Sequence, residues 1–178
     1  PRPNLHRGYA FDENADYTNY AGKNKNCYLI FDADNCRDCY YSYSTNACES
    51  TLDCFRVRNS ELAYECIDSY NCYHSAYLQN CKNCSDSYFL KNCIGCANCF
   101  GSINLRNKKY YFNNQPFSKE EYEAKIQSIN LGSYASVQEL VRQFSQIAAQ
   151  GSYRSIEGVQ NENVLGNYLT ECKNAKEC

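Results

Sequence analysis

The cysteines of this chain follow a spacing that neither of the common secondary structures produces. Twelve of the fourteen cysteines lie at sequence positions divisible by three. An amphipathic helix spaces its buried residues by three and four, and a half-buried strand spaces them by two. A constant spacing of three therefore indicates a chain that bends at short, regular intervals. The twelve residues are Cys27, Cys36, Cys39, Cys48, Cys54, Cys66, Cys72, Cys81, Cys84, Cys93, Cys96 and Cys99.

The triplet is a structural unit, because all three of its positions are biased. Every third residue from Cys27 to Leu105 gives 27 positions that hold twelve Cys, six Ser, three Leu, two Ala, two Thr, one Ile and one Val. The preceding position is Asn or Asp in 14 of the 27 triplets, and the following position is Tyr or Phe in ten. Asn and Asp tolerate positive φ, which suits a repeated bend. The small residues then point inward and the aromatic residues outward.

These observations predict a mainly β fold, a parallel β-solenoid with a small Cys-lined core, followed by two α-helices. The coil length stays open between twelve and eighteen residues. Eighteen residues would align ECIDSY (65–70) with NCSDSY (83–88). Twelve residues would instead stack Tyr28, Tyr40, Tyr64, Tyr88 and Phe100 in one outer column and Cys36, Cys48, Ser60, Cys72, Cys84 and Cys96 in one inner column.

The triplets also divide the chain into segments. Residues 1–14 are expected to form an entry or cap, 15–110 the solenoid, and 111–151 a two-helix connector or cap. The repeat restarts in 152–178, so we expect a second solenoid block in a longer protein, of which this chain, beginning at Pro1 and lacking Met, is a piece.

Two capping-box sequences predict the helices of the connector. Ser118 with Glu121 opens a helix that ends near Gly132, and Ser136 with Glu139 opens a second one. An apolar stripe on the second helix is expected to pack on the open end of the solenoid. The stripe consists of Val137, Leu140, Val141, Phe144 and Ile147.

Charge and hydropathy exclude several classes of partner. The chain has 18 basic and 20 acidic side chains without a long run of one sign, which argues against a nucleic-acid partner. No stretch reaches the roughly 18 apolar residues that a membrane span needs. No signal peptide is visible either, so a cytoplasmic location is predicted.

The residues NKNCYLIFDADNCRDCYYSYS (24–44), LQNCKNCSDSYFL (78–90) and NLRNKKYYFNNQPFSKEEYEAKI (104–126) carry a family resemblance. They resemble a Cys/Asn/Tyr-rich triplet-repeat protein family of bacterial metagenomes, some of whose members carry a CoA-transferase-like label. The resemblance implies two such blocks and, in some members, a zinc-ribbon-like segment before them. The chain has no Gly-rich nucleotide loop and no acidic nucleophile in a recognisable setting, so nothing in the sequence supports the transferase label.

The cysteines themselves allow three interpretations. The first is a structural interior, because a reduced cysteine behaves as a small buried hydrophobe. The second is a metal site for zinc or an iron-sulfur cluster, because C-x-x-C spacing is typical of both. Disulfides are the third, and they would require an exported protein. The densest candidate metal ligands are Cys81, Cys84, Cys93, Cys96 and Cys99.

The remaining candidates point to binding rather than to catalysis. His6 and His74 are isolated, and the cluster of Arg106, Lys108 and Lys109 is interpreted as a solvated turn. The outer Tyr column either stacks on itself or supplies a rigid interaction surface for a protein partner or a second copy. We therefore predict a non-enzymatic structural or protein-interaction module without a cofactor, with a metal-binding protein as the alternative.

Overall fold

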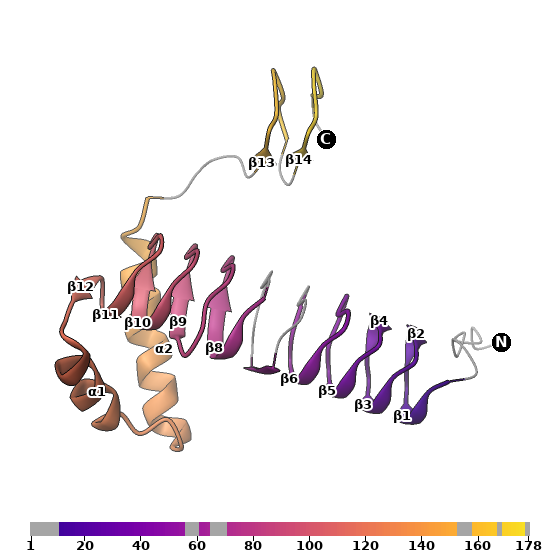
Figure 1. Ribbon diagram of the computed structural model, residues 1–178, viewed down its shortest axis with the longest axis horizontal. Helices are drawn as coiled ribbons and strands as arrows, with labels where there is room; N and C mark the ends of the chain where they lie inside the picture. Colours follow the sequence, from indigo (N-terminus) through magenta and orange to yellow (C-terminus); the bar gives the residue numbers. More distant parts are fainter. Residues whose placement is uncertain (1–10, 56–60, 65–70, 153–157, 167–168, 177–178) are drawn as a thin grey trace.

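A computed structural model describes residues 11–55, 61–64, 71–152, 158–166 and 169–176 of the 178-residue chain (Figure 1). A row of short strands forms one elongated body, and two helices lie at its C-terminal end. The strands and helices are β1 Glu13–Asp16, β2 Asn19–Gly22, β3 Lys25–Tyr28, β4 Phe31–Asp34, β5 Arg37–Tyr40, β6 Glu49–Leu52, β7 Glu61–Tyr64, β8 Tyr73–Gln79, β9 Tyr88–Lys91, β10 Ala97–Ile103, β11 Lys109–Phe112, β12 Gln115–Pro116, α1 Lys119–Gln127, α2 Tyr134–Ala149, β13 Gly158–Val159 and β14 Leu169–Thr170.

The strands form a parallel β-solenoid whose coil is twelve residues long. Lys25 of β3 pairs with Glu13 of β1 on one side and with Arg37 of β5 on the other, and this offset of twelve continues to β11. Each coil therefore lies directly against the next, as the sheet order β1-β3-β5-β6-β7-β8-β9-β10-β11-β12 requires. The predicted fold class is confirmed, and the eighteen-residue alternative is wrong. At its C-terminal edge β12 turns back and pairs antiparallel with β11.

Each coil has four corners, and each corner is a residue in the left-handed backbone region. Lys23, Asn26, Leu29 and Asp32 have φ values of 60°, 54°, 53° and 52°, three residues apart. Asn and Asp adopt this region at low cost because their side chains bond locally, whereas most residues lose roughly 1–2 kcal/mol there. The predicted role of Asn and Asp at repeated bends is confirmed. Corners that carry Tyr or Phe must gain their stability from side-chain packing.

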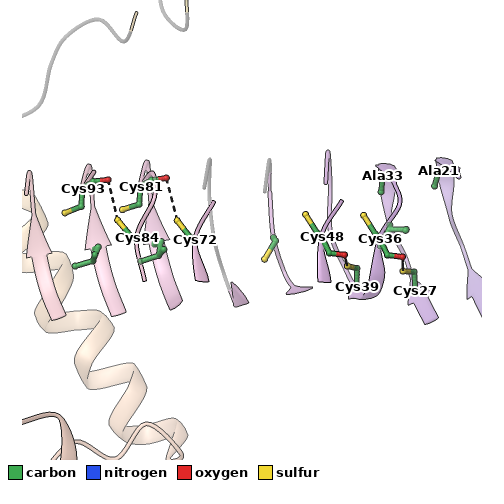
Figure 2. Packing of buried hydrophobic residues seen from close by; sticks show 14 of the residues in the cluster. Ala21, Cys27, Ala33, Cys36, Cys39, Cys48, Cys72, Cys81, Cys84 and Cys93 are labelled. Atoms are coloured by element: carbon green, nitrogen blue, oxygen red, sulfur yellow. Dashed lines mark hydrogen bonds between the residues drawn. The ribbon is translucent and has the colours of Figure 1, made fainter. Parts of the chain in front are cut away.

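The residue after each corner points into the coil and is buried. In the coil that begins at Cys27, the inward residues are Cys27, Ile30, Ala33 and Cys36, none more than 2 % exposed. Four inward columns therefore run the length of the solenoid, and sulfurs of one column point the same way in successive coils (Figure 2). The core is narrow, as the small size of the inward residues predicts.

The inward residues also accept hydrogen bonds from the backbone of the following coil. The N–H of Cys36 donates to Asn24 Oδ1 at 2.9 Å, and the N–H of Cys99 donates to Ser87 Oγ at 3.1 Å. Each bond joins residues twelve apart. The backbone N–H of Cys39 approaches the sulfur of Cys27 in the same way. Asn24 and Ser87 thus each satisfy a buried N–H that alanine or leucine at their positions would leave unpaired.

The two helices begin differently from one another. Ser118 and Glu121 form the predicted capping box of α1, and each side chain bonds the backbone of the other. The predicted capping box of the second helix is wrong, because α2 begins at Tyr134 and Ser136 lies inside it. Ser133 precedes this helix without a side-chain capping bond. Packing of the apolar stripe, rather than a side-chain cap, therefore stabilises the start of α2.

The stripe of α2 packs on the lateral face of the last coils. Val137, Leu140, Val141 and Phe144 contact a cluster around Phe89. The expectation that α2 covers the open end is therefore wrong, because the outward aromatic side chains make the lateral face the larger apolar surface. The terminal edge is instead paired with β12.

A separate two-stranded sheet forms after the helices. β13 and β14 pair in parallel, and Glu162 and Lys173 form a parallel bridge eleven residues apart. Cys172 N–H donates to Asn161 Oδ1 at 2.9 Å, so the inward acceptor pattern recurs. The coil in this segment is one residue shorter than a coil of the first block.

Candidate functional site

One side of the solenoid carries most of the outward aromatic residues, and we call it the aromatic face. It is built from the residue after one inward column together with the corner that follows. Successive coils repeat these two positions every twelve residues. The aromatic face consists of Tyr17, Tyr28, Leu29, Tyr40, Tyr41, Leu52, Tyr77, Tyr88, Phe89, Phe100 and Phe112.

Helix α2 covers the C-terminal half of the aromatic face. The ring of Phe89 stacks on Tyr77 at a centroid distance of 4.6 Å and contacts Phe144 of α2 at 6.0 Å. Phe100 stacks on Phe112 at 5.1 Å. Phe89 and Phe100 are 1 % and 4 % exposed, so the chain buries this half of the face against its own helix.

The helix does not fill the surface completely. A cavity of about 220 Å³ lies between α2 and the face, where Gly101 takes the corner position that Phe89 holds in the preceding coil. Gly101 has a φ of 59°, and a Cβ there would collide with Asn113 Oδ1. The missing ring at Gly101 is one reason why the cavity exists.

The N-terminal half of the aromatic face is open. Tyr17, Tyr28, Tyr40 and Tyr41 are 67 %, 38 %, 39 % and 52 % exposed. Tyr28 meets Tyr17 and Tyr41 edge-on at centroid distances of 5.4 and 5.8 Å. These contacts hold the rings in a fixed arrangement without burying them.

The five residues predicted as an interaction surface separate along this face. Tyr28 and Tyr40 lie in the open half, Tyr88 is half-buried, and Phe100 lies beneath the helices. Phe100 therefore does not belong to an exposed surface, because α2 packs on its coil. The side chain of Tyr64 lies outside the described residues. The sequence pattern does not identify Tyr17 and Tyr41, because both are corners and do not occupy the position after an inward residue.

The five predicted metal ligands are all inward and at most 1 % exposed. Cys81 and Cys93 share one column, Cys84 and Cys96 share the next, and Cys99 lies in a third. Within the described ranges no group of three or more His, Cys, Asp or Glu residues is arranged to hold a metal ion. Zinc or an iron-sulfur cluster stays a prediction.

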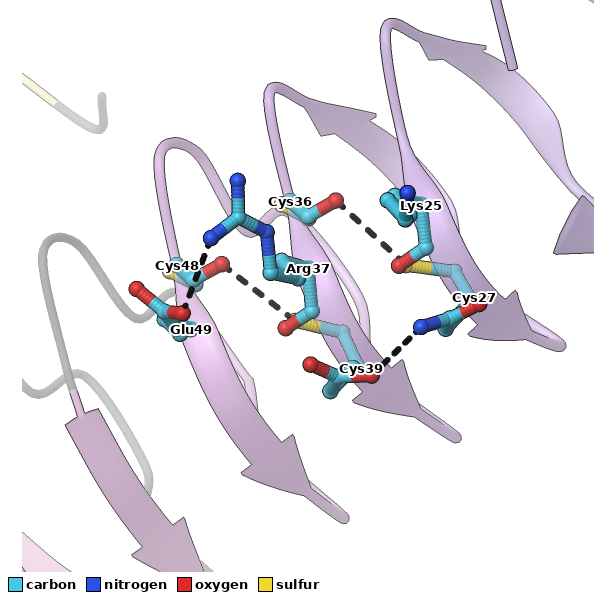
Figure 3. Close-up of polar contacts among 9 residues, drawn as sticks. Lys25, Cys27, Cys36, Arg37, Cys39, Cys48 and Glu49 are labelled. Carbon is cyan, nitrogen blue, oxygen red and sulfur yellow. Dashed lines mark hydrogen bonds and ion pairs between the residues drawn. The ribbon is translucent and has the colours of Figure 1, made fainter. Parts of the chain in front are cut away.

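The described thiols also bond to the backbone and to one another. Cys27 Sγ lies 3.2 Å from the carbonyl oxygen of Lys25 and 3.6 Å from that of Cys36, and Cys39 repeats this pattern with Arg37 and Cys48 (Figure 3). The pKa of Cys93 is raised because its thiol donates to the sulfurs of Cys81 and Cys96 and because it is buried. Cys93 is therefore neutral at ordinary pH.

Polar ladders run along the other outer positions. Asn14 donates to Asn26, and Asn26 donates to Asp38, each at 3.0 Å. His74 Nδ1 lies 2.9 Å from Asp86 Oδ1 in the same ladder. His74 therefore belongs to this ladder on the outside of the solenoid. The cysteines of the same coils point inward, away from its ring. His6 lies outside the described residues.

The prediction of a basic turn after the last coil is wrong, because Arg106 pairs with Ile94 and Lys109 pairs with Ala97 within a further coil. Arg106, Lys108 and Lys109 are exposed, and Arg106 donates to the carbonyl oxygen of Asn92 in the preceding coil. Lys108 lies over the ring of Tyr111 at 5.9 Å. The three cations are thus spread over the end of the solenoid and do not converge on one point.

Comparisons with known proteins leave the family open. No protein-family model matches the chain, and no match is found among curated proteins. A Bacillus cereus protein described as a candidate acetyltransferase is 9 % identical over 80 % of this chain and 91 % of its own, with a TM-score of 0.19. A hexapeptide transferase family protein from Anaplasma phagocytophilum is 11 % identical over 79 % and 93 %, also with a TM-score of 0.19. Similarity at this level does not bear on the activity of this chain.

No helix in the described part of the chain combines the length and the apolar character that crossing a bilayer demands.

Proposed function

We propose that this β-solenoid is a non-enzymatic interaction module, and that the open half of its aromatic face binds an amphipathic helix of another protein. One observation carries the proposal. The covered half of the same face already holds such a helix, because α2 lies against Phe89 and Phe100 through its apolar stripe. The open half repeats the same backbone positions with Tyr17, Tyr28 and Tyr41.

The chemistry of the open half suits a helix that is bound reversibly. Tyrosine offers a large ring for apolar contact and a hydroxyl that remains hydrated in the free protein, and it is enriched at interfaces for this reason. The edge-on contacts of Tyr28 with both neighbours restrict its ring before any partner arrives. Little side-chain freedom is then lost on binding, which favours affinity.

The surroundings of the open half give a partner further contacts. Tyr43 and Phe55 stack at 5.5 Å on the next side of the solenoid, and both are exposed. Lys25 with Glu13 and Arg37 with Glu49 form exposed ion pairs on another side. Because these charges are already paired with one another, we expect the apolar rings to supply most of the binding energy.

The test uses a labelled synthetic peptide with the sequence of residues 133–150, which contains α2, as the helix probe. We expect saturable binding to the full chain, measured by fluorescence anisotropy under reducing conditions. Tyr28→Ser combined with Tyr41→Ser should weaken binding about tenfold or more, as for hot-spot residues. Tyr134→Ser is the matched control, because Tyr134 is 80 % exposed and lies on α2.

Three results would overturn the proposal. Equal peptide affinity for the double variant and the parent chain would place binding elsewhere, for example at the covered half after displacement of α2. Absence of peptide binding would reject the helix as occupant. A concentration-dependent doubling of mass that the double variant abolishes would show that a second copy occupies the face. Circular dichroism of each variant verifies that the solenoid is still folded.

A further inference from the structure

Several inward columns place one thiol directly above another. Because the coil is twelve residues long, cysteines twelve apart occupy the same column in neighbouring coils. Corresponding atoms of neighbouring strands lie about 4.8 Å apart. In Figure 2 the sulfurs of Cys72 and Cys84 point in one direction, and those of Cys81 and Cys93 point in another. The described pairs are Cys27 with Cys39, Cys36 with Cys48, Cys81 with Cys93, and Cys84 with either Cys72 or Cys96.

We propose that these pairs bind a monovalent thiophilic ion, Cu(I), each ion held by two sulfurs of one column in neighbouring coils. The inference is independent of the aromatic face and of any partner bound there. It concerns the reduced protein, and eleven of the twelve cysteines among the described residues are buried. Soft thiolate ligands favour Cu(I) over hard cations.

The spacing of the sulfurs favours two-coordinate binding. An ion midway between sulfurs about 4.8 Å apart lies about 2.4 Å from each, close to the ~2.3 Å of a metal–thiolate bond. A tetrahedral zinc site instead needs four sulfurs about 3.8 Å from one another, the edge that ~2.3 Å bonds define. The described residues contain no group of three or more donors placed for a metal, whereas they contain several stacked pairs. Two sulfur ligands for each ion agree both with the lack of larger donor groups among the described residues and with the presence of stacked pairs.

The charge of the bound state also favours a monovalent ion. Two thiols lose two protons when they bind Cu(I), and the resulting dithiolate complex carries one negative charge. Four thiolates around Zn²⁺ would carry two negative charges, and buried charge is costly. Inward N–H groups would stabilise the negative charge of the complex. The backbone N–H of Cys93 approaches the sulfur of Cys81, and that of Leu105 approaches the sulfur of Cys93. Such donors to a ligand atom stabilise a bound metal.

The experiment titrates the anaerobic, reduced protein with Cu(I), supplied as its acetonitrile complex, in competition with bicinchoninate. Because the sulfurs are buried, one sample is titrated folded and a second is refolded from denaturant with Cu(I) present. We expect ions that the competitor does not remove, and X-ray absorption that shows two sulfur ligands for each copper. Affinity should rise about 100-fold for each pH unit, since two protons leave.

Two isosteric variants separate column pairs from a cluster. Cys93→Ser removes one member of the pair with Cys81, so the bound copper should fall by one ion per chain. Cys99→Ser is the matched control, because Cys99 is equally buried and its column neighbours, Ser87 and Tyr111, carry no thiol, so its sulfur meets another, that of Cys96, only across columns. This variant should bind as many ions as the parent. A serine at either position keeps an acceptor for the inward N–H.

Several outcomes would overturn the inference. Complete transfer of the copper to bicinchoninate from both samples would reject the site. Loss of one ion in Cys99→Ser, or three or more sulfurs around each copper, would indicate a cluster that crosses columns. Tight binding of Zn(II) by the folded protein with four sulfur ligands would restore the zinc prediction in its place.

Discussion

Several residues of the inward columns accept a hydrogen bond from the following coil, and Ser87→Ala tests what such a bond contributes. Ser87 is fully buried, and its Oγ accepts the N–H of Cys99 at 3.1 Å and donates to the carbonyl oxygen of Ser85 at 2.7 Å. That carbonyl keeps a second donor, the N–H of Asn98 at 3.1 Å. The variant therefore leaves one buried N–H without its acceptor, which costs about 1–3 kcal/mol.

The assay is equilibrium unfolding in denaturant under reducing, anaerobic conditions. Ser87→Ala should lower the free energy of unfolding by about 1–3 kcal/mol. Ser87→Cys should restore most of that loss, because its sulfur can accept the same N–H. Ser85→Ala is the control, because Ser85 is half-buried and points outward on the adjacent side of the same coil. It should change the free energy of unfolding by less than about 0.5 kcal/mol. If the alanine variant at position 87 were as stable as the parent, residue size alone would govern the columns and the reasoning would fail.

Three further predictions concern a corner, the helix contact and pH. Gly95→Ala should destabilise the chain by about 1–2 kcal/mol in thermal unfolding. Gly95 has a φ of 65°, and a Cβ there meets Asn107 Oδ1. Gly132→Ala is the control and should be nearly neutral. Phe89→Ala should cost about 3–5 kcal/mol and speed amide exchange throughout α2, since it removes the ring that Phe144 contacts; unchanged exchange would contradict this packing. Hydrogen bonds from Arg142 and Gln143 lower the pKa of Glu139 from its usual 4.5 to about 2. The ionised Glu139 therefore stabilises α2 above pH 4.5, and this stabilisation is lost as the pH falls through 2. Circular dichroism should report this loss of helix, and Glu139→Gln should remove the dependence.

The fold was predictable because the triplet pattern is local and uninterrupted. Coil length was left open because the inward residues alone look alike at offsets of twelve and eighteen. The outer charges contain the missing signal: Glu13 and Lys25, like Arg37 and Glu49, are opposite in sign, twelve residues apart and paired in the structure. Cross-coil charge matching would therefore have selected twelve.

Other features could not be predicted from local sequence. Phe100 follows the outer aromatic pattern that Tyr28 and Tyr40 also follow, yet α2 buries it through a contact with a segment some forty residues further along. The hydrogen-bonding role of some inward residues is not evident from their size, which Cys, Ser and Ala share. Their shared acceptor atom sets Cys and Ser apart from Ala, and Asn24 belongs with them despite its larger side chain.

The inward hydrogen bonds give the solenoid a direction. The inward N–H groups that donate to a side chain all reach the preceding coil, as from Asn24 to Asp12, from Ser87 to Ser75 and from Asn114 to Ser102. The side-chain acceptors of a coil therefore serve the coil that follows, while its backbone N–H groups donate in both directions, from Lys25 to Cys36 and from Leu29 to Asp16. An added coil reaches these side-chain acceptors only when it stacks head to tail. A grafted or tandem block of this repeat must enter in the same orientation to continue the core.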